Sequence, residues 1–232
     1  MFKLTLILPC YNEEQNIDNL FKNFYNLKNE LENIAILFLD NGSTDDTYKK
    51  ILENIERYKL TNFSHLSLKT NKGYGYGIKF ALKNIKTSYA GISHADLQIP
   101  SNETIRIANK FLKEENPGLF MGKRTGRSLF NQIFTQGMIW FVFIFSRYKF
   151  QDINAQPKYF TNSNEYNFEL FPNNFNFDLH LLLKTVELNK SIEYCKIDFY
   201  DRTAGKAKGG GSLSGKLKLT ISTFHYLLNL NT

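Results

Sequence analysis

The chain has 232 residues, of which 42% are hydrophobic and 22% are charged, and its formal net charge is +7. This balance is typical of a globular protein and excludes disordered and fibrous classes. Cys10 and Cys195 lie far apart without a second ligand at zinc spacing, which excludes a zinc ribbon and a disulfide scaffold and favours a reducing compartment. The excess of cations favours an anionic partner such as a nucleotide, a lipid phosphate or a nucleic acid.

The start of the chain is expected to be a buried strand and not a signal peptide, because residues 1–9 hold a short apolar run without a small-residue cleavage site. A transmembrane anchor is not expected, because no stretch reaches the roughly 18 uninterrupted apolar residues of a spanning helix. We expect a single domain over 1–232, since no linker or internal repeat divides the chain.

Strands and helices alternate through the first half of the chain. Apolar runs predict strands at 3–8, 34–39, 63–68 and 89–93, and helical spacing predicts helices at 13–31, 74–84 and 103–113 and one capped by Ser43 or Thr44. This alternation predicts a parallel sheet with helices on both faces and ligands at the carboxyl ends of its strands. The second half predicts an apolar segment at 129–147, a helix at 175–188, a strand at 192–200, a basic glycine-rich loop at 202–218 and a helix at 213–230.

Polar residues follow each of the four predicted strands. His94, Asp96 and Gln98 alternate along an extended segment, so their side chains are expected to project to one side. Oxygen ligands beside a pyrophosphate suit magnesium or manganese. A helix cap with a glycine turn would explain Ser43 and the acids after it, but not Asp40. Polar sites after all four strands together favour a functional interpretation. The glycines at 73–77 and 210–215 match neither a dinucleotide fingerprint nor a P-loop.

The order and spacing of these motifs resemble a family-2 glycosyltransferase with the GT-A fold, of the dolichyl- or polyprenyl-phosphate sugar transferase type. The matching stretches are Leu8-Pro9-Cys10-Tyr11-Asn12-Glu13-Glu14, Asp40-Asn41-Gly42-Ser43, Asn71-Lys72-Gly73, Ala95-Asp96-Leu97-Gln98 and Gly122-Lys123-Arg124, with weaker matches at Asp152 before Gln156-Pro157-Lys158 and at Arg202. The resemblance covers nearly the whole chain. It implies a Rossmann-like α/β fold whose mostly parallel central sheet is flanked by helices, with a nucleotide-sugar-binding half (1–125) and an acceptor-binding half (126–232).

The resemblance also implies roles for individual residues. A nucleotide-sugar donor would bind Pro9, Tyr11, Glu13, Asp40, Ser43, Lys72, Gly73 and Asp96. Donor or acceptor phosphates would bind Arg124, Arg202 and Lys206. A divalent cation, Mn²⁺ or Mg²⁺, would be held by Asp96, Gln98 and His94. Metal and cations together would stabilise the charge that develops on the nucleoside diphosphate leaving group during an inverting transfer, in which Asp96 and Asp152 are the catalytic candidates.

Two departures from the family pattern concern this site. The family usually has paired acids at Asp40-Asn41 and an Asp-x-Asp motif at His94-Ala95-Asp96. His94 either ligates the metal as a neutral imidazole or only hydrogen-bonds a phosphate. We therefore expect a weaker metal site that favours manganese over magnesium.

Two acceptors remain open. A polyprenyl phosphate oxygen is already ionised and needs positioning more than a base, whereas a sugar hydroxyl in surface-polysaccharide assembly needs a base such as Asp152, unless that residue only orders its loop. The apolar residues 138–145 form either a core element or an interfacial helix with Trp140 near the headgroups.

We expect transfer to polyprenyl phosphate at the cytoplasmic membrane face by a cytoplasmic protein, with peripheral association left open. A degenerate nucleotide-sugar-binding protein without turnover is the alternative from another class. Nucleic acid is the least favoured partner, because the basic residues cluster in one late loop instead of forming a stripe interleaved with aromatic residues.

Overall fold

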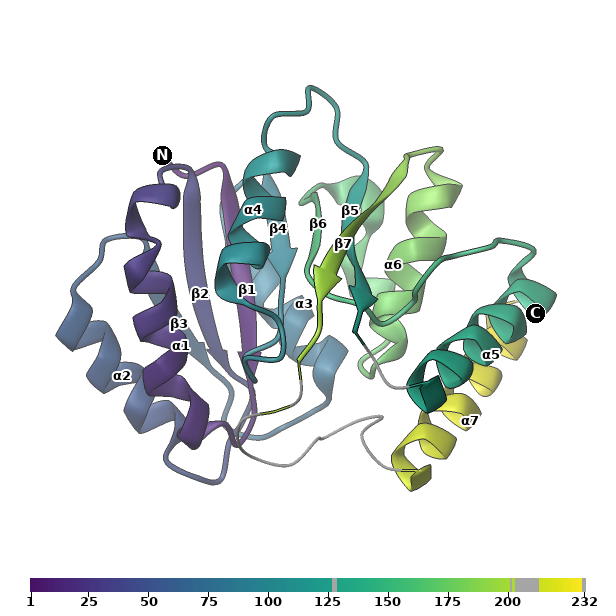
Figure 1. Cartoon of the computed structure of the whole chain (residues 1–232), viewed down its shortest axis with the longest axis horizontal. Coiled ribbons are helices and arrows are strands. Elements are labelled where there is room, and N and C mark those ends of the chain that lie inside the picture. Colours follow the sequence, from purple (N-terminus) through teal and green to yellow (C-terminus); the bar gives the residue numbers. More distant parts are fainter. Residues whose placement is uncertain (127–128, 201, 203–212, 231–232) are drawn as a thin grey trace.

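The structure is a computed structural model and describes residues 1–126, 129–200, 202 and 213–230. A seven-stranded sheet runs through the molecule in the order β3-β2-β1-β4-β6-β5-β7 (Figure 1). The strands are β1 (Leu4–Cys10), β2 (Ile34–Asp40), β3 (Phe63–Ser67), β4 (Tyr89–Ile92), β5 (Leu119–Thr125), β6 (Lys158–Thr161) and β7 (Ile192–Asp198). Only β6 is antiparallel to its neighbours, β4 and β5. The expected mostly parallel sheet is therefore confirmed.

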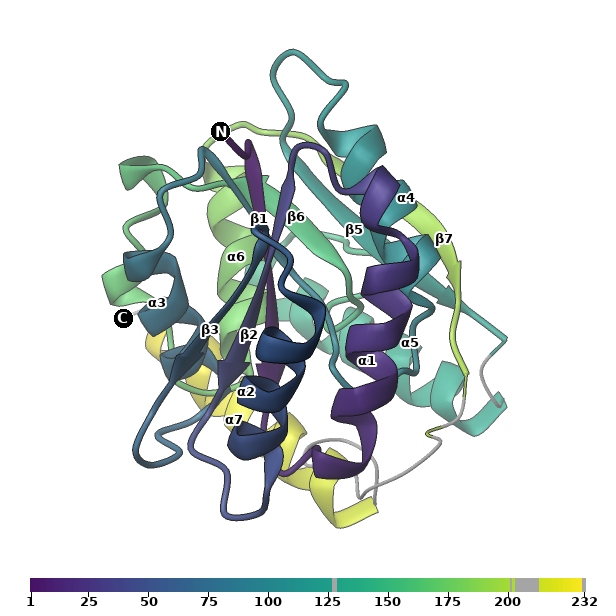
Figure 2. The same cartoon turned by 90° about the vertical axis from the view of Figure 1, so that its left-hand side faces the viewer.

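Helices cover both faces of the sheet (Figure 2). On one face lie α1 (Glu14–Asn26), α2 (Thr47–Tyr58) and α4 (Ser101–Phe111), and on the other lie α3 (Tyr74–Asn84) and α6 (Asn176–Glu187). Successive side chains of a strand point to opposite faces. Accordingly Phe38 of β2 packs with the α1 side, whereas Leu37 and Leu39 pack with the α3 side. Buried apolar side chains on both faces explain why these strands are continuous apolar runs.

The last two long helices, α5 (Leu129–Ser146) and α7 (Leu213–Leu230), lie together beyond α6 (Figure 1). Phe224 of α7 packs against Phe141 and Phe145 of α5, with ring centroids 5.9 and 5.8 Å away. By length and composition α5 is apolar enough to cross a membrane, and only 17% of it is buried. This finding rests on length and composition alone, so the expected absence of a transmembrane anchor stays a prediction.

Several local predictions need correction. The second helix begins at Thr47, and neither Ser43 nor Thr44 caps it; the Thr47 amide instead donates to Asp45 Oδ1 at 3.0 Å. The first helix ends at Asn26, and a short 3₁₀ turn, Lys28–Glu30, follows it. Strands β5 and β6 were not predicted at all, because neither has a period-2 pattern of apolar residues. Two further 3₁₀ turns, Asn164–Tyr166 and Phe168–Leu170, precede α6.

Candidate functional site

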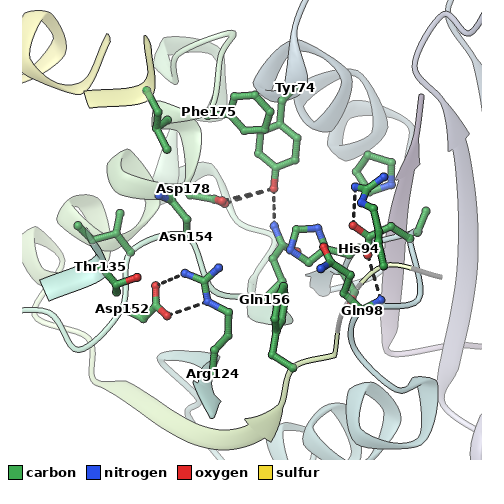
Figure 3. A pocket seen from close by; sticks show the side chains of 18 of the residues that line it. Tyr74, His94, Gln98, Arg124, Thr135, Asp152, Asn154, Gln156, Phe175 and Asp178 are labelled. Carbon is green, nitrogen blue, oxygen red and sulfur yellow. Dashed lines mark hydrogen bonds and ion pairs between the residues drawn. The ribbon is translucent and has the colours of Figure 1, made fainter. Parts of the chain in front are cut away.

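A cavity of about 950 Å³ opens where the parallel strands end (Figure 3). Because β6 is antiparallel, the residues that precede it reach the same edge of the sheet as the carboxyl ends of β4 and β5. The predicted site residues in the cavity wall are Pro9, Tyr11, Glu13, Gly73, His94, Asp96, Gln98, Arg124, Asp152 and Arg202. The structure thus brings together residues that are almost 200 positions apart in the chain. Lys206 lies outside the described residues.

Three predicted donor-binding residues are not in the cavity wall. The buried Asp40 carboxylate accepts hydrogen bonds from the Ser43 amide (3.0 Å) and the Ser67 hydroxyl (2.9 Å). Ser43 Oγ in turn accepts from the Asn12 amide at 3.0 Å. These bonds tie the loops after β1 and β2 together, so Asp40 and Ser43 position the wall from behind. Lys72 lies over the Tyr76 ring at 5.2 Å.

Gly73 does line the cavity, and its backbone explains why this position is a glycine. Its φ of 112° and ψ of 161° are essentially open to glycine alone. A Cβ atom here would lie 2.3 Å from the Asn173 carbonyl oxygen. The close approach that the sequence suggests is therefore made, in this structure, to the chain segment before α6.

An arginine from the end of the chain joins the two acids of the first half. Arg202 Nη2 lies 2.6 Å from Asp96 Oδ2, and its Nη1 lies 3.2 Å from Glu13 Oε1. Burial raises the pKa of Glu13, and its hydrogen bond from Asn16 and the charge of Arg202 oppose that rise. Arg202 therefore neutralises two buried carboxylates at the place where a diphosphate and its cation are expected.

The metal prediction rests on Asp96, Gln98 and His94. Among the residues that the structure describes, no group of three His, Cys, Asp or Glu side chains is arranged to hold a metal ion. Asp96 Oδ1 accepts from the Gln98 amide at 3.1 Å, and Gln98 Nε2 donates to the Tyr200 carbonyl at 3.1 Å. Burial lowers the pKa of His94, so its imidazole is neutral near pH 7. Residues 95–99 form bends and Leu97 has a φ of 61°, so the expectation of an extended segment is wrong. One carboxylate, one amide and one neutral imidazole remain chemically suitable ligands for a divalent cation.

Arg124 and Asp152 form a partly buried ion pair with two hydrogen bonds in the cavity wall (Figure 3). Arg124 Nε and Nη2 donate to the two Asp152 oxygens at 2.9 and 2.8 Å. Such a fork fixes both side chains strongly. The pairing favours the interpretation in which Asp152 orders its loop and orients Arg124, rather than acting as a base.

The far end of the cavity is built by α5 and α7. Phe134 and Met138 of α5 and Leu219 of α7 line it. Lys216 is buried there, donates to Asn131 Oδ1 at 2.7 Å and lies over the Phe134 ring at 5.4 Å. This end therefore combines apolar walls with a cation.

Sequence reasoning gave no role to a buried polar group at the wall of the same cavity, although Gln156 and Lys158 belong to a weak family match. Lys158 begins β6, and Asp178 lies in the first turn of α6; their side chains pair at 3.4 Å Nζ to Oδ1. Tyr74 and Gln156 complete the group. The available signal was one charged residue in each of two otherwise apolar runs, namely Lys158 in Lys158-Tyr159-Phe160 and Asp178 in Phe177-Asp178-Leu179.

Comparison with solved structures supports the fold. The chain is similar to glucosyl-3-phosphoglycerate synthase from Mycobacterium tuberculosis, solved with Mn²⁺ and UDP, with a TM-score of 0.74 over 97% of this chain and 80% of that one at 14% identity. It is also similar to a mannosyltransferase from Pyrobaculum calidifontis, solved with GDP-Man and Mn²⁺, with a TM-score of 0.62 over 88% and 58% of the chains at 18% identity. The expected GT-A type of fold is confirmed.

Curated relatives match part of the chain. A dolichyl-phosphate beta-glucosyltransferase from Dictyostelium discoideum is 28% identical over 130 residues, 53% of this chain and 40% of the relative. A poly-beta-1,6-N-acetyl-D-glucosamine synthase from Staphylococcus aureus (strain COL) is 25% identical over 119 residues, 51% of this chain and 28% of the relative. The chain thus spans less than half the length of these two proteins.

The model of the family described as "Glycosyl transferase family 2" matches residues 5–171. This segment contains the motifs after β1, β2 and β4 and the Arg124–Asp152 pair, and it is well over half of the chain. The expectation of a family-2 glycosyltransferase is therefore confirmed: this protein belongs to glycosyl transferase family 2.

Proposed function

We propose that the protein transfers a sugar, with inversion, from a nucleoside diphosphate donor to a polyprenyl phosphate at the cytoplasmic face of a membrane. The observation that carries the proposal is the two-ended cavity. One end holds Glu13, which follows β1, Asp96, which follows β4, and the Arg202 side chain that pairs with both. The other end lies between α5 and α7 and combines apolar side chains with a lysine. A nucleotide suits the first end, and a lipid phosphate suits the second.

At the donor end, Pro9, Tyr11, Glu13 and Gly73 are proposed to hold the nucleotide. Arg202 is placed to meet the negative charge that develops on the leaving diphosphate. Asp96, Gln98 and His94 would hold a divalent cation, which when bound supplies further charge neutralisation at the diphosphate. The neighbours solved with Mn²⁺ and a nucleotide support such a cation in this fold.

At the acceptor end, Arg124 and Lys216 are proposed to bind the phosphate of the lipid. Arg124 is oriented for this by Asp152, and Lys216 lies among aromatic rings of α5. An ionised phosphate oxygen needs orientation more than proton removal. The printed name of the Dictyostelium relative, a dolichyl-phosphate glucosyltransferase, is consistent with this acceptor class.

The outer surface of α5 supports peripheral membrane association. Trp140 is 58% exposed, and Ile133 and Ile144 are exposed as well. Lys149 lies over the Trp140 ring at 5.9 Å, at the end of the helix. An exposed apolar helix with a tryptophan and flanking cations suits the lipid headgroup region. The interpretation of residues 138–145 as a core element fits Met138, Ile139 and Val142, which are buried, and Phe141 and Phe145, which pack against the core.

Membrane association is tested by flotation of the purified chain with neutral and anionic vesicles. We expect flotation with anionic vesicles and its loss in a Trp140→Gln, Ile144→Gln variant. Leu52→Gln, which alters an exposed leucine on α2 at the other end of the sheet, is the matched control. If the chain floats with neither the neutral nor the anionic vesicles, peripheral association is contradicted.

The reaction itself is tested with UDP-glucose and GDP-mannose as donors and polyprenyl phosphate, an oligosaccharide or water as acceptors, with Mn²⁺, Mg²⁺ or EDTA. We expect a glycosylated lipid phosphate. Arg124→Met should raise the KM for the lipid and leave donor affinity unchanged. Transfer to the oligosaccharide alone, abolished by Asp152→Asn, would instead establish the hydroxyl-acceptor function. Donor binding without any turnover would establish a nucleotide-sugar-binding protein.

A further inference from the structure

A lysine–aspartate pair that the proposed transfer does not use lies at the wall of the cavity. Lys158 is 0% exposed, and its ammonium donates to the Ala155 carbonyl at 2.7 Å and pairs with Asp178 at 3.4 Å. Buried charges are costly unless they are paired and hydrogen-bonded. Asp178 lines the cavity, whereas Lys158 lies behind it. The fully buried Lys158 thus pairs with the Asp178 carboxylate, which faces the cavity.

The Asp178 carboxylate has unused hydrogen-bonding capacity. Its contacts within the described part of the chain are long, at 3.4 Å to Lys158 Nζ and 3.4 and 3.5 Å to the Tyr74 hydroxyl. An ionised carboxylate accepts about four hydrogen bonds, and strong ones to oxygen donors are about 2.5–2.7 Å long. Hydroxyl groups of a ligand would therefore supply the hydrogen bonds that the Asp178 carboxylate can still accept.

Gln156 provides a second acceptor in the same wall. Its Nε2 donates to the Tyr74 hydroxyl, so the amide and Asp178 share Tyr74 as a partner (Figure 3). Gln156 is 2% exposed, and its Oε1 has no hydrogen-bond partner among the residues that the structure describes. A buried acceptor without a partner is unusual in a native protein and calls for a ligand or an ordered water.

The strand order locates this group relative to the donor. Asp96 follows β4, Gln156 precedes β6, and these strands are neighbours in the sheet. His94, Asp96, Gln156 and Asp178 all line the same cavity. A group attached to a diphosphate at Asp96, and directed away from the nucleotide side over β1 and β2, would therefore extend towards Asp178 and Gln156.

We propose that Asp178 and Gln156 accept hydrogen bonds from hydroxyl groups of the donor's sugar, and that Lys158 and Tyr74 are positioning residues for them. The ligand class is a neutral hexose carried on a nucleoside diphosphate. The inference rests on the proposed function, because it places the diphosphate beside Asp96. It names the residues that distinguish a nucleotide sugar from the bare nucleotide.

Calorimetry compares the affinities for UDP-glucose and GDP-mannose with those for UDP and GDP. Asp178→Asn should weaken binding of the preferred nucleotide sugar about 10- to 100-fold and leave that of the nucleoside diphosphate unchanged. Lys158→Met should likewise weaken binding of the nucleotide sugar alone, whereas general loss of the fold would weaken binding of both the nucleotide sugar and the nucleoside diphosphate. Asp18→Asn, on the side of α1 that faces α2 and outside the cavity wall, is the matched control and should change neither affinity.

The wild-type protein provides a test that needs no variant. Monodeoxy analogues of the preferred nucleotide sugar should bind about 10- to 100-fold more weakly when the missing hydroxyl is one that Asp178 or Gln156 accepts. Equal binding of all analogues would overturn the inference. So would an equal effect of Asp178→Asn on nucleotide and nucleotide sugar, or reduced turnover with unchanged affinities, which would make Asp178 a base. Failure of the wild type to bind any of the four nucleotides would refute the proposed function instead.

Discussion

Separating the two charges of the Lys158–Asp178 pair should be more harmful than removing both. The Lys158 side chain is 0% exposed and that of Asp178 is 5% exposed, so little solvent can replace a lost partner. Removing one member of a buried ion pair costs about 3–5 kcal/mol, because the other charge stays buried and uncompensated. At about 2–4 °C per kcal/mol for a domain of this size, Lys158→Met should lower the Tm by about 6–20 °C.

The assay is a double-mutant cycle on thermal or urea unfolding with Lys158→Met, Asp178→Asn and the double variant. The double variant leaves no unpaired charge, so its loss should be smaller than the sum of the single losses by about 0.5–3 kcal/mol. Asp18→Asn serves as control, because the Asp18–Lys50 pair is solvent-exposed and worth at most about 1 kcal/mol. Single losses below about 1 kcal/mol, or strict additivity, would refute the argument that the pair is buried and mutually compensated.

Three further outcomes follow from the same structure. Burial lowers the pKa of Lys158, and Asp178 only partly opposes this, so the folded protein releases that proton at lower pH than the unfolded chain. The unfolding free energy of the wild type should therefore rise relative to Lys158→Met as pH increases towards the ordinary lysine pKa of about 10.4, and a fall in chemical denaturation would contradict this. Arg202→Gln frees Asp96 and Glu13 from their cation, so Mn²⁺ should raise its melting temperature more than that of the wild type, and an equal shift would mean that Arg202 does not compete with the metal. Gly73→Ala should cost about 1–3 kcal/mol, because its φ is 112° and its Cβ would lie 2.3 Å from the Asn173 carbonyl. Gly137→Ala, in α5 with nothing within 4 Å of the added Cβ, should be neutral or stabilising by up to about 1 kcal/mol, and equal losses in the two variants by differential scanning calorimetry would refute the argument for Gly73.

Local sequence pattern was sufficient for the first half of the fold. The apolar runs of β1 and β2 and the helical spacing of Ile17, Leu20 and Phe21 depend only on neighbours along the chain, and they predicted the alternating elements. Placing Glu13 and Asp96 at one edge followed from that alternation, because parallel strands all end at the same edge. The structure has both in one cavity wall.

Local sequence pattern did not predict which side chains from distant segments pair with each other. Asp40 follows a strand like the other site residues, yet its carboxylate is bound by Ser43 and Ser67 and lies outside the cavity wall. A strand-end position gives the edge of the sheet, but not the direction in which the side chain finds its hydrogen bonds. Likewise Arg124 and Asp152 were singled out separately, and only the fold pairs them with each other.

By itself the sequence determined the strand–helix alternation, the residues that gather at one sheet edge and the family to which they belong, because periodicity and motif spacing are local properties. Only the tertiary structure decided that β6 runs against its neighbours, that Arg202 returns to Asp96, and that Lys158 meets Asp178. These two ion pairs join residues that are 106 and 20 positions apart. They depend on strand order and direction, and on the desolvation that makes a buried charge require a partner, which no window of neighbouring residues encodes.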